Sequence, residues 1–524
     1  MLAMLGRSRA SLTAAAAVFL ILTGCLSPAG AEAQAGKPRP HRALTLDQRV
    51  DAILRRVHAD RGSWGIEVAE LPGGKILYRR NAGQLFVPAS NMKLFTTAAA
   101  LEKLGPDFVF RTTVESDAAS DAQGRVADLY LVGRGDPNLG SRVLPYTPGS
   151  KPLAPADRVF EELAAQVKAR GVREVTGNLV ADDSYFLYEP FAANWAADDL
   201  QWGYGAPVTA LAFNDNSLAL HVKPGAKVGE PAQVWLDPVP DYYQLNNRLE
   251  TSAASTAQRI FVERAPGSME LDVWGQVPLD ASEDGDTVSI AHPPELIGEM
   301  FRRRLEAQGI VVRGRVVVRH LTRLEAVTSP DPFPASPRAV LAEHDSLPLR
   351  EEIKVINKVS QNLHAEMLLR TLARETKKYG SLTVGLEALN EFVAGAGIAR
   401  GETFFSDGSG LSREDLVTPQ AIVRLLEFMS RSPRFPDYYH SLPIAGVDGT
   451  LEKRFTGMRV AGRIHAKTGS VEHVSALSGY MELPRGRRLA FSMIGNNHTL
   501  KESEGAAVLD AVALAVYDGF ARRR

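Results

Sequence analysis

The spacing of apolar and polar positions predicts that the chain begins with a compact α/β unit. Leu46 to His58 has the apolar spacing of an amphipathic helix, and Ser63 to Ala69 and Lys75 to Tyr78 form two strand patterns around a Pro-Gly-Gly turn. Lys93 to Leu104 is rich in Ala and Leu and stops at Gly105-Pro106. We therefore expect a β-hairpin followed directly by a buried helix with a sharp end.

The pattern changes between Asp107 and about Leu321, where short β-type runs alternate with Gly, Pro and Asp. The clearest runs are Phe110 to Glu115, Val126 to Val132, Leu218 to Val222 and Arg259 to Glu263. This region also contains a repeat. At Pro155 to Val180 and again at Pro293 to Val318, a helical pattern that opens on a proline and stops at a glycine precedes a β-type run. The two units predict one α+β lobe whose halves are separated by the β-rich stretch between them.

Long helical patterns return after residue 322 and are followed by strand patterns. The predicted helices are Asn362 to Lys378, Leu382 to Ala394, Pro419 to Ser430 and Glu504 to Phe520, and the predicted strands are Val460 to Ala466, Val474 to Glu482 and Leu489 to Ile494. Both ends of the chain are therefore expected to form one α/β domain, which a large insert interrupts after the Lys93–Leu104 helix.

The N-terminus has the pattern of an export signal. Two arginines precede an apolar run from Leu12 to Leu22, which is too short to span a bilayer. Cys25, the only cysteine of the chain, follows Leu-Thr-Gly and resembles the lipidated cysteine of a bacterial lipobox. Cleavage after one of two A-x-A sequences between Ala31 and Ala35 is the alternative. We expect export, followed by a tether over 36–43, and both outcomes at Cys25 stay open.

Composition narrows the function classes. The 524 residues carry a formal net charge of -1, with 23% charged and 45% hydrophobic residues. This composition is that of an ordinary globular protein with more than one domain, and it does not point to nucleic acid. H-E-x-x-H, P-loop and G-x-S-x-G motifs are absent from the sequence, so a zinc peptidase, an NTPase and an α/β-hydrolase have no support.

Candidate chemistry begins at Pro88-Ala89-Ser90-Asn91-Met92-Lys93. Ser90 lies at the first turn of the predicted helix, and Lys93, three residues on, shares its face. A hydroxyl beside a buried amine is the core of a serine nucleophile with a lysine base. A helix-capping serine and a lysine that extends to solvent explain the same residues without chemistry, so the rest of the chain has to decide.

Two further stretches favour chemistry. Ser360-Gln361-Asn362 begins a predicted helix and supplies a hydroxyl and an amide, although helix capping alone accounts for it equally well. Lys467-Thr468-Gly469 ends a predicted strand, where lysine and hydroxyl suit a carboxylate and the glycine lets a substrate backbone approach. In this order S-x-x-K, S-D-N and K-T-G are the signature of penicillin-binding proteins and serine β-lactamases, here with Gln361 in the middle of the second motif. The set predicts a serine acyl-enzyme.

The chain resembles the D-alanyl-D-alanine carboxypeptidases/endopeptidases of the low-molecular-mass, class C penicillin-binding proteins over nearly everything after the signal. The long interval between Ser90 and Ser360 fits this family, which carries extra domains there. Further matching stretches are Leu104–Phe108, Gly133–Pro137, Asp182–Phe186, Ser406–Arg413, Leu442–Gly446, Asp448–Leu451 and Ala466–Ser470.

The resemblance implies an α+β fold. A penicillin-binding, serine β-lactamase-like catalytic domain, built as an antiparallel sheet flanked by helices, would carry a large inserted β-rich region of one or two extra domains. The expected boundaries are a signal peptide over 1–35, a tether over 36–43, a catalytic domain over 44–107 and 322–524, an inserted α+β domain over 108–210 and 288–321, and a nested small β domain over 211–287.

The resemblance also implies a role for each motif residue. Ser90 would attack the penultimate D-alanine of a peptidoglycan stem peptide ending in D-Ala-D-Ala, Lys93 would take its proton, and Ser360 would pass a proton to the leaving amine. The expected substrate-binding groups are Asn362 for the substrate amide, Lys467 and Thr468 for the terminal carboxylate, Gly469 beside them, and the N–H groups of Ser90 and Ser470 for the oxyanion. β-Lactams would act as covalent inhibitors in the periplasm or cell envelope, with no metal or organic cofactor.

A lysine base must be neutral near pH 7, about three units below the ordinary lysine pKa of ~10.4. A second cation at ~4 Å in a partly buried site lowers a pKa by about that amount. Lys467 is the expected neighbour of Lys93, with burial adding to the effect.

Recognition of the substrate side chain is expected from the insert, because the family uses an acidic residue there to meet the free amine of the diamino acid. Asp199 is the predicted residue, preferred over Asp198 for its spacing to Ala206-Pro207. A solvated loop carboxylate is the alternative reading of Asp199.

Two other functions stay open on the sequence. One is a serine β-lactamase or esterase of the same fold. Glu387-Ala388-Leu389-Asn390 comes nearest to the deacylating E-x-x-L-N of class A enzymes, but it is one residue short and lies in a helical pattern. The other is a catalytically silent cell-wall binding protein, against which the intact motif set argues. His364 and His465 adjoin the motifs but have no role in this mechanism, and we expect them to be structural.

Overall fold

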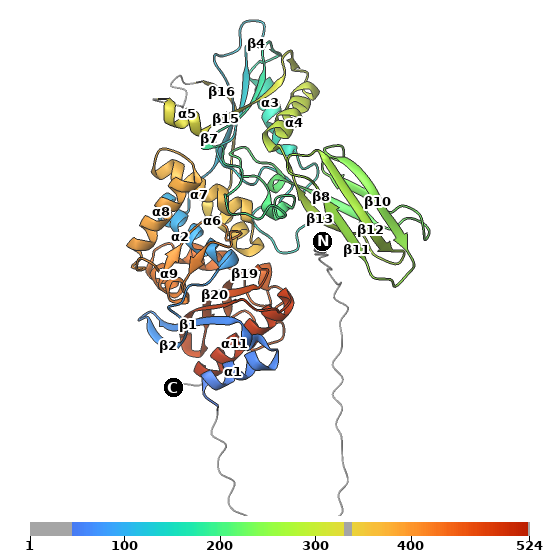
Figure 1. Cartoon of the computed structure of the whole chain (residues 1–524). Helices are drawn as coiled ribbons and strands as arrows, with labels where there is room; N and C mark the ends of the chain where they lie inside the picture. The colour runs from blue at the N-terminus through green and yellow to red at the C-terminus, as the bar shows by residue number, and fades with distance from the viewer. Residues whose placement is uncertain (1–43, 330–337, 522–524) are drawn as a thin grey trace, which may run out of the picture.

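The computed structural model describes residues 44–329 and 338–521, so the predicted signal, tether and Cys25 lie outside the described residues. A five-stranded antiparallel sheet in the order β19-β20-β21-β1-β2 joins the two ends of the chain (Figure 1). Its strands are β1 (Ser63–Leu71), β2 (Lys75–Arg80), β19 (Ile464–Val471), β20 (Val474–Glu482) and β21 (Arg488–Asn496). The N-terminal hairpin is thus completed by strands from the other end of the chain.

Helices cover both faces of this sheet. α1 (Leu46–Arg56) and α11 (Glu502–Phe520) pack on one face, around a core that includes Val68 and Phe491. The helices of the other face are α2 (Lys93–Leu104), α7 (Asn362–Thr376), α8 (Leu382–Gly395) and α9 (Pro419–Arg431). Every residue of α2 from its first to Leu101 is buried, because its Ala and Leu positions are surrounded by these helices and the sheet. The buried helix predicted behind Ser90 is confirmed, with the predicted ends.

A second five-stranded sheet, β15-β7-β5-β3-β16, combines four strands of the predicted insert with β16, which lies in the range predicted for the catalytic domain. Its strands are β3 (Arg111–Ser116), β5 (Leu129–Val132), β7 (Leu179–Leu187), β15 (Val316–Leu321) and β16 (Ala339–Asp345). The two repeated units pair in parallel, β15 with β7 and β14 (Val311–Val312) with β6 (Glu174–Val175), which confirms their predicted association. α3 (Arg158–Ala169) and α4 (Pro293–Ala307) complete this part, with Phe160 and Phe301 in contact in its core.

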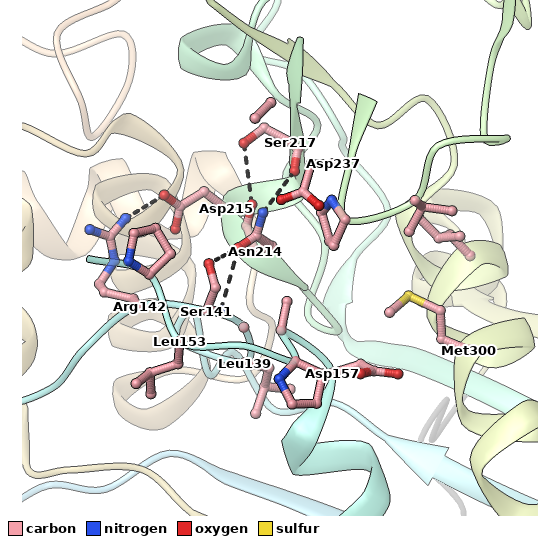
Figure 2. Close-up of a pocket in the computed structure, with 18 of the residues that line it drawn as sticks. Leu139, Ser141, Arg142, Leu153, Asp157, Asn214, Asp215, Ser217, Asp237 and Met300 are labelled. Atoms are coloured by element: carbon pink, nitrogen blue, oxygen red, sulfur yellow. Dashed lines mark hydrogen bonds and ion pairs between the residues drawn. The ribbon is translucent and has the colours of Figure 1, made fainter. Parts of the chain in front are cut away.

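Two three-stranded sheets, β13-β8-β9 and β10-β12-β11, project to one side of the molecule (Figure 1). Their strands are β8 (Ser217–Lys223), β9 (Gln233–Asp237), β10 (Gln244–Ser252), β11 (Arg259–Glu263), β12 (Glu270–Pro278) and β13 (Asp284–Ser289). Their inner side chains continue the core of α3 and α4. A cavity of about 1100 Å³ lies between β9, α4 and the loop that precedes α3 (Figure 2).

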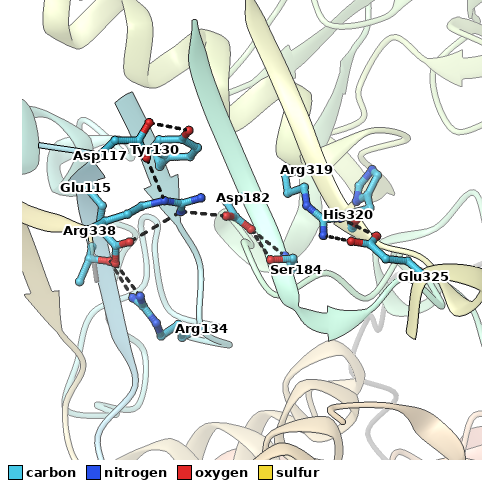
Figure 3. A network of polar contacts seen from close by, with 11 residues as sticks. Glu115, Asp117, Tyr130, Arg134, Asp182, Ser184, Arg319, His320, Glu325 and Arg338 are labelled. Atoms are coloured by element: carbon cyan, nitrogen blue, oxygen red, sulfur yellow. Dashed lines mark hydrogen bonds and ion pairs between the residues drawn. The ribbon is translucent and has the colours of Figure 1, made fainter. Parts of the chain in front are cut away.

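Polar contacts hold strands of the second five-stranded sheet together (Figure 3). Arg134 donates to Glu115 on β3 at 2.6 Å, and Arg338 donates to Asp182 on β7 at 3.3 Å. The guanidinium of Arg338 also lies over the ring of Tyr130 on β5, 3.5 Å from its centroid. These pairs neutralise two carboxylates that are less than one tenth exposed.

An apolar contact fixes the insert on the catalytic helices. Phe186, Trp195 and Val208 of the insert pack with Leu363 and Met367, which lie in α7. The insert therefore meets α7 beside Asn362, the first residue of that helix. The remaining short elements are α5 (Arg323–Thr328), α6 (Leu349–Lys354), α10 (Phe435–Ser441), β4 (Arg125–Val126), β17 (Thr403–Phe404) and β18 (Leu416–Val417).

Three predicted elements were wrong in their bounds. The strand predicted over Val460–Ala466 starts at Ile464 and runs to Val471, because Gly462 at φ 71° keeps the preceding residues in a turn. The strand predicted over Val126–Val132 divides into β4 and β5, which belong to different sheets, and α3 begins three residues after Pro155. In the part of the chain that the structure describes, no helix combines the length and apolarity needed to cross a membrane.

Candidate active site

The fold brings the three sequence motifs together around two buried lysines. Ser90 lies in a short 3₁₀ turn, Ala89–Met92, directly before α2. Lys93 Nζ is 2.9 Å from Ser90 Oγ and 2.6 Å from Asn362 Oδ1. Lys467 Nζ lies 2.8 Å from Ser360 Oγ. The five residues predicted to form the core of the site therefore lie in one cluster.

Three oxygens surround the amine of Lys93. Its Nζ donates to Asn362 Oδ1 and to the backbone oxygen of Ser409, each at 2.6 Å, and lies 2.9 Å from Ser90 Oγ. The Ser90 hydroxyl is therefore within proton-transfer distance of the amine. Ser409 was missed from the sequence, because its role is a backbone contact more than 300 residues away.

Burial lowers the pKa of Lys93 to about 7, against the opposing charges of Asp407, Glu366 and Asp415. The side chain is fully buried, so the protonated form loses its hydration. The expectation that Lys467 is the main cause of this lowered pKa is wrong, because burial is the largest cause. Lys467 is fully buried as well, and burial and Lys93 together lower the pKa of Lys467 well below its usual value.

The second motif is held by an irregular backbone. A π-helical turn over Val355–Val359 ends at Ser360, which has the left-handed conformation with φ 67°. Gln361, not Ser360 or Asn362, caps α7, because its side chain accepts a hydrogen bond from Leu363 N at 3.0 Å. Helix capping therefore explains Gln361 and does not explain Ser360 and Asn362, for which it was considered. Their side chains are directed to Lys467 and Lys93 instead.

The third motif lies inside the edge strand β19 rather than after a strand. Ala466 N donates to Pro443 O, outside the sheet. Alternate residues of a strand direct their N–H groups to the same side, so Thr468 and Ser470 present theirs along this open edge. The edge contacts the 3₁₀ turn that holds Ser90. The oxyanion role of the Ser470 N–H stays a prediction.

Gly469 has a structural use that the sequence did not indicate. A Cβ at this position would lie 2.7 Å from Pro88 O and 3.2 Å from Asn91 N. Glycine therefore lets the turn that carries Ser90 pack directly against β19, and its predicted contact with a substrate backbone stays a prediction.

Two more hydroxyl contacts border β19. Thr468 Oγ1 donates to Thr450 Oγ1 at 2.8 Å, and Ser470 Oγ donates to Glu502 Oε1 at 2.7 Å. Gly449 N donates to the hydroxyl of Tyr146, which belongs to the loop before α3, at 3.2 Å. Thr450 lies in a stretch that matches the family, but only the fold shows that it contacts Thr468.

A buried loop around Asp407 positions the backbone oxygen of Ser409 that contacts Lys93. The carboxylate of Asp407 accepts hydrogen bonds from three backbone N–H groups of its own loop and from Trp195 Nε1 of the insert at 2.9 Å. Glu366 of α7 accepts from Gly408 N and pairs with Arg370 at 2.9 Å. Burial and Asp407 raise the pKa of both Glu366 and Asp415. These carboxylates hold the loop that presents the Ser409 oxygen to Lys93.

The predicted specificity residue Asp199 lies next to this site. Its Oδ1 accepts a hydrogen bond from the hydroxyl of Tyr204 at 2.9 Å, and the backbone oxygen of Tyr204 accepts from Asn362 Nδ2 at 2.9 Å. Asp199 is partly exposed, whereas the side chain of Asp198 is exposed. Tyr204 links the insert to Asn362 and was missed from the sequence.

His364 is structural, as expected, and its contacts tie the insert to α7. Its Nδ1 lies 2.7 Å from Glu352 of α6, and its Nε2 lies 2.8 Å from Asp215, which pairs with Arg142 beside the cavity of Figure 2. Burial disfavours the charged ring, but Glu352 and Asp215 outweigh burial and raise the pKa of His364 to about 9. His364 is therefore a buried cation between two carboxylates at pH 7.

This cation makes stability depend on pH. Because the pKa of His364 is raised above its unfolded value of ~6.5, its contribution is fully present below pH 6.5 and is lost as pH rises through about 9. We expect His364→Gln to lower the melting temperature at pH 6 and the difference from the parent protein to shrink towards pH 10. Thermal unfolding at pH 6, 8 and 10 measures this, with exposed His440→Gln as the matched control. An equal loss at all three pH values would contradict the assignment.

Comparisons with known proteins identify relatives of the whole chain. The D-Ala-D-Ala carboxypeptidase 3 (S13) family matches residues 46–516. A D-alanyl-D-alanine carboxypeptidase of Actinomadura sp. (strain R39) is 37% identical over 506 residues, which cover 94% of this chain and 88% of that protein. The crystal structure of penicillin-binding protein 4 (dacB) from Haemophilus influenzae superposes with a TM-score of 0.74 at 23% identity, covering 90% of this chain and 99% of that one. A structure of the same protein with a bound β-lactam gives a TM-score of 0.70.

The structural neighbours have the predicted fold, a penicillin-binding catalytic domain with an insert, which confirms the fold class. The family match spans most of the chain, and the Actinomadura relative covers nearly all of it. The resemblance stated from the motifs is confirmed as well. The chain belongs to the D-Ala-D-Ala carboxypeptidase 3 (S13) family.

Proposed function

We propose that this protein is an exported serine D-Ala-D-Ala carboxypeptidase that acts on peptidoglycan stem peptides through an acyl-enzyme on Ser90. The observation that carries the proposal is the environment of Lys93. Its Nζ lies 2.9 Å from Ser90 Oγ, Asn362 Oδ1 and Ser409 O hold it in place at 2.6 Å, and burial lowers the pKa of Lys93 to about 7. A lysine so placed is a general base, since its neutral form is populated at working pH.

In the first half-reaction Ser90 Oγ forms a bond to the carbonyl carbon of the penultimate D-alanine while its proton moves to Lys93. The N–H groups of Ser90 and Ser470 stabilise the negative charge that develops on the carbonyl oxygen. The amide bond then breaks, and the leaving D-alanine takes a proton through Ser360, which is hydrogen-bonded to Lys467. Water attacks the resulting ester in the second half-reaction and restores Ser90.

The terminal carboxylate of the substrate is recognised at the edge of β19. Lys467 supplies a buried amine, which donates to Thr468 O, and Thr468 supplies a hydroxyl, which contacts Thr450, so two donor groups lie at neighbouring residues of this strand. β-Lactams carry a carboxylate next to a reactive amide, and the same groups would place them on Ser90 as slowly hydrolysed adducts. The Haemophilus influenzae relative has been crystallised with a β-lactam.

We also propose endopeptidase activity on cross-links, because a cross-link between stems is also an amide that ends on a D-alanyl carbonyl. Digestion of purified sacculi and separation of the muropeptides by mass tests both activities. Loss of terminal D-alanine alone identifies a carboxypeptidase, and conversion of cross-linked dimers to monomers identifies an endopeptidase. Sacculi left unchanged would overturn the proposal.

The β-lactamase alternative is disfavoured by the position of Glu387. This residue lies in α8 with an exposed side chain, away from the cluster around Lys93. Class A β-lactamases deacylate with a glutamate that activates water at the ester. Slow release of a bound penicillin is therefore expected from this protein.

We propose that Asp199 binds the free amine of the diamino acid in the stem peptide. We expect Asp199→Asn to lower kcat/KM about tenfold for a stem peptide that contains diaminopimelate, which corresponds to about 1.4 kcal/mol for one lost ion pair. The same variant should act normally on a peptide whose side-chain amine is acetylated. Asp198→Asn, one residue away, is the matched control. Unchanged turnover of the diaminopimelate peptide by Asp199→Asn would contradict the assignment.

A further inference from the structure

The sheet β10-β12-β11 has one face that the core leaves uncovered. Leu249, Leu271 and Val273 point inward and are fully buried. Side chains alternate along a strand, so the residues between them point outward. The register places Arg248 beside Trp274 and Trp274 beside Phe261 in one row, and Asn246, Asp272 and Glu263 in the next row.

The first row contains an aromatic platform. The rings of Phe261 and Trp274 are stacked with centroids 5.5 Å apart and an interplanar angle of 18°. Trp274 is 37% exposed, whereas tryptophan side chains in folded proteins are highly buried on average. Because Phe261 stacks on the indole, the exposed ring of Trp274 is held in one orientation on the sheet.

Polar side chains lie around this platform and have unused hydrogen-bonding capacity; we call these four residues, Asn246, Arg248, Glu263 and Asp272, the frame. They form a depression of about 260 Å³ whose lining residues are Asn246, Arg248, Glu263, Asp272, Val273 and Trp274. Within residues 44–329 and 338–521, no side-chain hydrogen bond or ion pair involves the first four of these. Elsewhere on the insert, by contrast, charged side chains pair, as Arg304 does with Asp157. The frame offers amide, guanidinium and carboxylate groups to one ligand.

A fixed exposed indole beside planar donors and acceptors is suited to a sugar ring. The C–H face of a pyranose packs on an aromatic ring through dispersion, while its hydroxyl and acetamido groups bind amides, guanidinium and carboxylates at the rim. Two carboxylates against one guanidinium repel polyanions, which excludes nucleic acid and acidic polymers. The frame is also too polar for an apolar protein partner.

We propose that this outer face of the sheet β10-β12-β11 binds N-acetylhexosamine units of the peptidoglycan glycan strand. The choice of this glycan rests on the proposed function, since every stem peptide is attached to such a strand. The sheet lies on the far side of the insert from α2 and α7 (Figure 1). Binding there holds the enzyme on the polymer and takes no part in amide cleavage.

Titration calorimetry of the mature chain with a tetramer of N-acetylglucosamine, and co-sedimentation with chitin, an uncharged polymer of the same sugar, test the proposal. We expect Trp274→Ala to weaken binding of both probes at least tenfold, and Asp272→Ala to weaken it less. Trp235→Ala is the matched control, because Trp235 stacks on His221 on the neighbouring sheet instead. Release of D-alanine from a soluble tripeptide should be unchanged in all three variants.

Failure of the parent protein to bind either saccharide would overturn the proposal, as would undiminished binding by Trp274→Ala. Binding of poly-glutamate or of free stem peptide at this face, in place of the saccharides, would overturn it too. The tripeptide assay separates this outcome from a failure of the proposed function. If the parent protein binds glycan but releases no D-alanine, the proposed function is overturned and the saccharide site is not.

Discussion

Ser90→Ala protein is expected to release no D-alanine from a stem peptide and to form no stable adduct with labelled penicillin. Removing the nucleophile of a serine acyl-enzyme lowers turnover by on the order of 10⁴- to 10⁶-fold, because no other group can form the ester. Fluorescent penicillin followed by denaturing electrophoresis measures the adduct, and release of free D-alanine measures turnover. The variant should fold normally, since among the described residues the Ser90 hydroxyl contacts Lys93 alone, and Lys93 keeps its contacts with Asn362 and Ser409.

Ser430→Ala is the matched control for this experiment. The Ser430 hydroxyl donates within its own helix, to Glu427 O at 2.7 Å. The control should keep both adduct formation and turnover, and both variants should unfold at temperatures close to that of the parent protein. Retention of penicillin by Ser90→Ala would show that another nucleophile carries the chemistry.

Lys93→Ala is expected to lower the rate of acylation by about 10²- to 10⁴-fold, the usual contribution of a general base. In the parent protein the acylation rate should rise with pH through about 7, because burial lowers the pKa of Lys93 to that value and only the neutral amine accepts the proton. Stopped-flow acylation by a chromogenic β-lactam from pH 5.5 to 9 measures both effects. The rising limb should disappear in Lys93→Ala.

Lys103→Ala provides the control, since this lysine lies in the last turn of the same helix and is exposed. It should leave both the rate and the pH profile unchanged. A pH profile that keeps its rising limb near 7 after Lys93→Ala would assign that limb to a different group, and Lys467 would be the next candidate base.

The local elements of this protein follow from its sequence. Helix α2 begins and ends where the Ala- and Leu-rich run does, and β20 has the predicted bounds, because apolar periodicity and a terminal glycine or turn act over a few residues. The start of β19 was predicted four residues early, since the apolar run before Gly462 resembles a strand until the turn is seen. The nature of the site was also predictable, because the three motifs in order name a nucleophile, a base and their partners.

The environment of Lys93, the proposed base, was decided by the tertiary structure. The oxygen of Ser409 contacts it from a distant part of the chain, and its burial, which outweighs the opposing charges of Asp407, Glu366 and Asp415, accounts for its lowered pKa. The contact that makes Gly469 necessary likewise joins two distant segments. The sequence by itself determined which local elements form and which chemical groups are available. Their distances, burial and protonation depend on segments hundreds of residues apart packing together, which no local pattern encodes.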